Sequence, residues 1–219
     1  MKKIVLLLFV LCLVVFSFSK SGVASDDWQY WNEFVFEHEI NEKWESVLKA
    51  EQKFSDDCSD CTTYNFSLEG IHKINNMHSL GFGYMYEKEK ADDEWPREHR
   101  FTTKLITKWK IDNIKLKLYN KLEYRDFEEE KDKWRYRLKL KGSTSVDLNG
   151  FSFNPFISDE VFYDFDDNEL NKNRFAFGIE KGLTNNIEAS LYYLRETSKN
   201  DNDNWPGINV IGTEFVIVF

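Results

Sequence analysis

The feature that most constrains the fold of this chain is a two-residue alternation of apolar and polar side chains. In one segment, Leu116, Leu118 and Leu122 share one face while Lys117 and Lys121 share the other. Because successive side chains of a strand point to opposite faces, the pattern predicts strands with one apolar and one charged face. It recurs in residues 44–53, 100–110 and 134–141. A soluble two-sheet sandwich also alternates, but the dense charge favours a transmembrane β-barrel, apolar toward lipid and polar toward its lumen.

The connectors between these segments fall into two classes, as at the two ends of a bacterial barrel. The tight turns are Asn41-Glu42, Asn75-Asn76, Asp112-Asn113 and Thr184-Asn185-Asn186, with residues 143–150 as a longer member of the set. The longer, acidic loops are residues 56–60, 89–96, 126–132, 164–172 and 198–206.

Eleven strand segments can be counted along the chain. They are residues 27–40, 43–54, 62–74, 77–88, 99–111, 114–126, 133–142, 151–163, 173–182, 187–197 and 207–219. Bacterial single-chain barrels have an even number of strands, so either the first segment is two strands or one segment lies outside the wall. We predict an all-β, antiparallel up-and-down barrel of about ten to twelve strands.

The N-terminus has the pattern of an export signal. Lys2 and Lys3 precede an apolar run over residues 4–18, and small residues follow up to Ala24. The alternative is an anchor helix, but the run is short for a span of roughly 20 residues. Cys12 lies inside the run rather than at the cleavage point, so we expect no lipid anchor. We predict a cleaved signal peptide over residues 1–24 and one barrel domain over residues 25–219.

The overall composition limits the partners. The 219 residues carry 29 Lys and Arg against 38 Asp and Glu, a net charge of −9, which argues against a nucleic-acid partner. Aromatic residues make up 16% of the chain, which argues against disorder. Aromatic residues near the segment ends predict girdles at the membrane interfaces: Trp28, Tyr30, Trp31, Trp44, Trp95, Trp109, Trp134 and Trp205.

The last segment places Phe215, Ile217 and the terminal Phe219 on one face. It resembles the terminal strand by which the assembly machinery of Gram-negative bacteria recognises outer-membrane proteins. Further similarities lie in residues 28–40, 99–101, 135–137, 155–163, 174–178 and 191–193. Through these residues the chain resembles an uncharacterised family of predicted outer-membrane barrels, known only as a domain of unknown function. The resemblance implies a barrel in the bacterial outer membrane, and it implies no activity.

Turning the aromatic face toward lipid places two sets of charges in the lumen. The basic wall is Arg100, Lys104, Lys108, Lys115, Lys117, Lys121, Arg135, Arg137 and Lys139. The acidic wall is Glu33, Glu37, Glu45, Glu51, Glu69, Glu160 and Glu180. Opposed walls favour a small passive channel for charged or dipolar solutes. Alternatively, the walls interlock as ion pairs and give a closed structural or surface-interaction barrel, since ten to twelve strands lie between filled and open barrels.

A lipid-active enzyme is the third alternative, with His99 as its base. No Ser and acid partners of His99 are evident in the neighbouring segments, and a nucleophile must lie within hydrogen-bond distance of its base. We therefore predict that the protein is not an enzyme.

The sequence offers few candidates for a disulfide, a metal site or a cofactor site. Cys58 and Cys61 are spaced to form a disulfide in an oxidising compartment. We expect no metal site and no cofactor, because the acidic loops match no defined calcium loop. The expected partners are outer-membrane lipids, lipopolysaccharide and the assembly machinery, which would engage Phe219.

Overall fold

The computed structural model describes residues 27–92, 94–200 and 202–219, so the predicted signal peptide at residues 1–24 lies outside the described residues. The strands are β1 (Trp28–Glu39), β2 (Trp44–Ser55), β3 (Asp60–Lys73), β4 (His78–Glu89), β5 (Arg97–Ile111), β6 (Ile114–Phe127), β7 (Lys133–Thr144), β8 (Val146–Leu148), β9 (Phe151–Asp164), β10 (Glu169–Gly182), β11 (Ile187–Ser198) and β12 (Gly207–Val218). The described residues include no helix that is long and apolar enough to cross a membrane.

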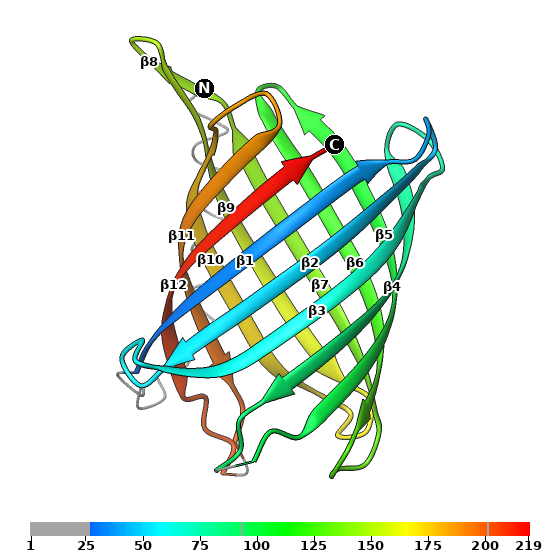
Figure 1. Cartoon of the computed structure of the whole chain (residues 1–219), viewed down its shortest axis with the longest axis vertical. Helices are drawn as coiled ribbons and strands as arrows, with labels where there is room; N and C mark the ends of the chain where they lie inside the picture. The colour runs from blue at the N-terminus through cyan, green and yellow to red at the C-terminus, as the bar shows by residue number, and fades with distance from the viewer. Residues whose placement is uncertain (1–26, 93, 201) are drawn as a thin grey trace.

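Eleven strands close into a barrel, in the order β1 to β7 and then β9 to β12 (Figure 1). Consecutive strands pair antiparallel, but β1 and β12 pair parallel, from Trp28 opposite Asn209 to Glu37 opposite Val218. The parallel seam follows from the odd number, because the first and last strands of an odd up-and-down set run in the same direction. The predicted barrel of ten to twelve strands is confirmed, and the seam explains how an odd number of segments closes.

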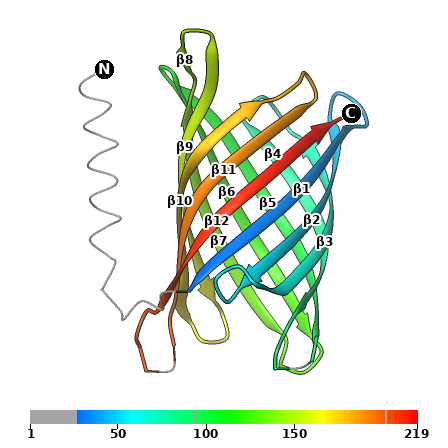
Figure 2. The ribbon, with the colours of Figure 1, turned by 60° about the vertical axis from the view of Figure 1, so that its left-hand side comes forward.

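Strand β8 lies outside the wall and pairs only with β9, from Val146 opposite Phe153 to Leu148 opposite Phe151. Asn149 and Gly150 join the two strands with positive φ angles of 54° and 88°. Both central residues of a type I′ hairpin require such angles, which Asn and Gly tolerate best. The hairpin projects beyond one end of the barrel (Figure 2), within the segment for which the sequence predicted a longer turn.

The two ends of the barrel differ in their connectors. At the short-turn end, the Asn41 side-chain oxygen accepts hydrogen bonds from the N–H groups of Lys43 and Trp44, and Asn75 does the same for Met77 and His78. These side chains mimic backbone and tighten the turn. The chain enters β1 at the opposite, long-loop end, whereas β12 ends at the short-turn end.

The outer face of the wall is apolar. Large exposed side chains on it include Phe34, Leu48, Phe66, Leu68, Phe82, Phe101, Leu122, Phe177 and Leu191. A soluble monomer rarely exposes a continuous apolar surface of this extent, whereas hydrocarbon favours it. The chain is therefore a transmembrane β-barrel.

The tryptophans divide between the two faces. Trp28, Trp44 and Trp134 are exposed near strand ends, as expected of a girdle. Trp31 is only 5% exposed, because it faces the lumen and packs with Leu194 and Val210. The prediction that Trp31 belongs to the girdle is wrong, and its position in the same alternation as the luminal Glu33 is the reason.

Adjacent residues on β6 and β7 test the inward and outward assignment. We expect Leu118→Lys and Leu138→Lys each to lower the unfolding free energy by about 2–4 kcal/mol, because they place a charge in hydrocarbon. Lys117→Leu and Lys139→Leu are the matched controls, and they should still insert. Urea unfolding in lipid vesicles measures all four. Equal tolerance of both pairs would contradict the assignment.

Candidate functional site: the charged lumen

The lumen contains a cavity of about 820 Å³ whose lining extends to both ends of the barrel. Ser55 and Thr62 line it at the long-loop end, and Lys108 and Asn185 line it at the short-turn end. This is the volume open to the centre of a water molecule, and spread over an apolar band about 25 Å tall it has an average radius of about 3 Å. Adding the water radius of about 1.4 Å gives an average bore of about 4–5 Å in radius. The space therefore suits ions and solutes of a few heavy atoms.

The structure places nearly all the predicted luminal residues in the lining of this cavity. From the basic wall these are Arg100, Lys104, Lys108, Lys117, Lys121, Arg135, Arg137 and Lys139. From the acidic wall they are Glu33, Glu37, Glu45, Glu51, Glu69, Glu160 and Glu180. Lys115 differs, because it is exposed near the short-turn end of β6 and is not part of this lining.

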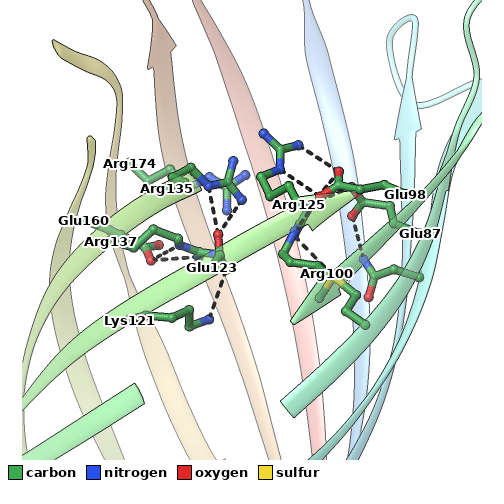
Figure 3. Close-up of polar contacts among 12 residues, drawn as sticks. Glu87, Glu98, Arg100, Lys121, Glu123, Arg125, Arg135, Arg137, Glu160 and Arg174 are labelled. Atoms are coloured by element: carbon green, nitrogen blue, oxygen red, sulfur yellow. Dashed lines mark hydrogen bonds and ion pairs between the residues drawn. The ribbon is translucent and has the colours of Figure 1, made fainter. Parts of the chain in front are cut away.

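Toward the long-loop end, arginines and glutamates form a buried network (Figure 3). Arg100 Nε donates to Glu98 at 2.8 Å, and its Nη2 atom lies 3.0 Å from Glu87. Arg125 donates to both carboxylate oxygens of Glu98 at 2.7 Å. Fork-to-carboxylate pairs of this kind are short and directional, so they fix the side chains of β4, β5 and β6 relative to one another.

A second group centres on Glu123 of β6, which is 1% exposed. Arg135 and Arg137 of β7 lie 2.7 and 2.9 Å from its two oxygens. Arg137 also pairs with Glu160 of β9 at 2.7 Å (Figure 3). Burying a charge costs several kcal/mol unless partners satisfy it. Here the buried carboxylates and guanidinium groups are satisfied by opposite charges on the neighbouring strands.

An aromatic side chain fills the space between these arginines. Phe162 is 1% exposed, and the guanidinium carbons of Arg135, Arg137 and Arg174 lie 5.3, 4.6 and 5.1 Å from its ring centre. Cations over an aromatic face are stabilised by the ring quadrupole. Arg174 also pairs with Glu196 of β11 at 2.5 Å, so the network continues around the wall.

Glycines make room for one ion pair that spans a strand. Lys104 of β5 pairs with Glu69 of β3, and both side chains pass over β4. A Cβ atom at Gly81 would lie 2.7 Å from the Lys104 Cε atom, and one at Gly83 would lie 2.8 Å from the Glu69 Cγ atom. Larger luminal residues on β4 would therefore displace this pair.

The ion pairs run along the wall and not across the lumen. Among the described residues, every luminal ion pair joins positions on one strand, on adjacent strands or on strands separated by one other. The expectation of two walls of single sign therefore needs correction toward the long-loop end. Arginines and glutamates alternate there because each charge is satisfied by its neighbour.

Of the acidic members of this network, sequence reasoning assigned Glu160 to the lumen but not four others. These are Glu87, Glu98, Glu123 and Glu196, all of them buried. The signal that could have found them is the alternation itself, since Glu98 and Glu123 each lie two residues from an inward arginine on the same strand.

Two other predicted features lie away from the lumen. Cys58 and Cys61 are free thiols, with Cys58 Sγ directed at the Trp28 carbonyl and Cys61 Sγ at the Thr63 carbonyl. The disulfide is not formed in this structure and stays a prediction. His99 lies beside Tyr84, whose hydroxyl is 2.7 Å from His99 Nδ1. No group of three or more His, Cys, Asp or Glu suited to a metal ion occurs in the described part of the chain.

The closed wall, the apolar outer face and the polar cavity define a transmembrane β-barrel with a charged lumen. A family model described as "Protein of unknown function (DUF2490)" matches residues 28–206. The chain belongs to this family, which confirms the resemblance inferred from its sequence.

Comparison with solved structures gives a distant match to an anion-selective porin from Comamonas acidovorans. The two chains are 10% identical, with a TM-score of 0.39, and the match covers 78% of this chain and 55% of the porin. This chain thus spans about half the length of that porin. No curated protein matches the sequence.

Glu123 allows a direct test of the network. Glu123→Gln should lower the unfolding free energy by about 3–5 kcal/mol, because two buried guanidinium groups lose a charged partner. The matched change Glu39→Gln breaks an exposed pair with Lys73 and should cost less than about 1 kcal/mol. Urea unfolding of both variants measures the difference. Equal losses would show that the network contributes no more than a surface pair.

Proposed function

We propose that this protein lies in the bacterial outer membrane and forms a narrow passive channel for small charged or dipolar solutes. The observation that carries the proposal is the luminal cavity, whose lining reaches both ends of the barrel. Its average bore of about 4–5 Å in radius would pass small solutes and exclude bulky ones.

The charged lining supports a hydrated lumen. Side chains such as Glu33, Lys117 and Glu180 line the cavity, and a polar space of this size holds water. Water along the lumen is what a channel requires.

The direction of the ion pairs favours the channel over the closed barrel. Pairs such as Arg137 with Glu123 and Glu160 join adjacent strands, so they need not cross the lumen. One observation supports the closed barrel, namely that many of these luminal charges are buried. Conductance distinguishes the two.

The outer-membrane location rests on the apolar outer face and the export signal expected at residues 1–24. Phe215 stacks on Phe34, and Phe219 on Phe36, beside the seam of β12 and β1. These aromatic side chains support our proposal that the assembly machinery engages the strand ending at Phe219. Outer-membrane lipids and lipopolysaccharide would contact the wall.

We propose no catalytic role. The Nδ1 atom of His99 is hydrogen-bonded to Tyr84, and its outward neighbour on β6 is Asp126. These positions offer no serine nucleophile to the histidine, which a hydrolase would need within hydrogen-bond distance.

Planar-bilayer recording tests the channel. The protein without residues 1–24, refolded and inserted, should give stable open steps. In a salt gradient, the reversal potential should indicate weak selectivity between K⁺ and Cl⁻, because the lumen presents charges of both signs. Silence from a preparation that is folded by circular dichroism would favour the closed barrel.

A further inference from the structure

Charges at the short-turn end of the lumen are arranged differently from those in the rest of the cavity. Glu37, Glu45, Lys108, Lys117 and Glu188 line the cavity within three residues of the short-turn ends of their strands. None of these side chains forms an ion pair or side-chain hydrogen bond with the described part of the chain. We call these five residues the mouth charges.

The mouth charges are separated by sign. The three glutamates lie on β1, β2 and β11, and the two lysines lie on β5 and β6. Around the wall, β3 and β4 separate the two groups on one side, and β7, β9 and β10 separate them on the other. The carboxylates therefore face the ammonium groups across the lumen.

Two further charges, Lys141 of β7 and Glu180 of β10, line the cavity near this end, but they pair with each other. Among the described residues, the mouth charges are therefore the ones at this end that lack a protein partner. Opposite charges held apart around a narrow water-filled space produce a field perpendicular to the barrel axis. A solute with both charges can satisfy both groups at once, whereas a simple ion satisfies one group and is repelled by the other.

We infer that the mouth charges select small zwitterions, molecules that carry one carboxylate and one ammonium group, as they pass this end of the channel. The carboxylate of the solute would face Lys108 and Lys117, and its ammonium would face Glu37, Glu45 and Glu188. The inference rests on the proposed channel and names its substrate class.

The short-turn end is suited to this selection because the mouth charges are not paired with other groups of the protein. At the long-loop end, Glu98 and Glu123 are already bound by arginines, so a passing solute would have to displace a partner. At the short-turn end, Lys108 is exposed, and Glu37 and Lys117 are half-buried. Their charged atoms remain available to a solute.

Glycine and glycolamide provide the sharpest pair of probes, since they are isomers and only glycine is zwitterionic. In proteoliposome swelling assays, glycine should enter at least about threefold faster than glycolamide, the factor expected for one charge contact near 6 Å in water. Equal rates through a protein that conducts ions would overturn the inference and leave the channel standing. Absence of passage for glycine, glycolamide, K⁺ and Cl⁻ would overturn both.

Two double variants separate the roles of the two groups. Glu37→Gln with Glu45→Gln should shift the reversal potential toward Cl⁻ preference, and Lys108→Gln with Lys117→Gln should shift it toward K⁺ preference. Each should reduce the glycine-to-glycolamide ratio toward one. Their folding should be preserved, because these side chains bind no protein partner.

The matched control is Glu42→Gln with Lys43→Gln, which removes one charge of each sign from the exposed β1–β2 turn outside the cavity lining. It should keep both the reversal potential and the glycine preference of the original protein. If the mouth variants leave the ratio unchanged, or if the control reduces it equally, the inference is wrong.

Discussion

Confining many charges within a small closed cylinder is the physical constraint on which the rest of this structure depends. The wall has an apolar outer face, so its charged side chains point inward, away from bulk water. A buried charge is tolerated only when partners satisfy it. Adjacent strands bring side chains close together, and the network therefore forms sideways, as between Glu123 and the two arginines of β7.

This lateral arrangement has a functional consequence. Pairs that follow the wall occupy its inner surface and leave space for a narrow cavity whose lining reaches both ends of the barrel. Two other features support this arrangement of the pairs. Phe162 fills the space between guanidinium groups, and the glycines of β4 make room for the Lys104–Glu69 pair. The short-turn end differs, because opposed charges there remain available to a solute.

Much of the fold could be predicted from the sequence, because alternation and turn residues are local signals. The segment 114–126 became β6 (Ile114–Phe127), and the turns at Asn41 and Asn75 fall where those residues predicted them. The parallel seam was missed although eleven segments were counted, because we fitted that count to the even number of strands usual in bacterial barrels instead of pairing the first and last strands in parallel. Strand β8 was missed because three residues carry too short an alternation to separate a strand from a turn.

The luminal site, like the fold, could be predicted only in part from the sequence. Side-chain direction depends on the local alternation, so Arg100, Lys104 and Glu69 could be placed in the lumen from the sequence. The choice of partner depends on the register between strands. Arg137 lies beside Glu123 and Glu160 because β7 pairs with β6 and β9 in one particular register, and no local pattern determines that register.

The most direct test of this account is the size of solute that enters the open channel. Single-channel conductance can be recorded in solutions of neutral polyols and polyethylene glycols of increasing size. The account predicts that ethylene glycol enters and lowers the conductance as it lowers that of the bulk solution. Polymers wider than a bore of about 4–5 Å in radius should leave the conductance nearly unchanged. Entry of large polymers, or exclusion of ethylene glycol, would contradict the account.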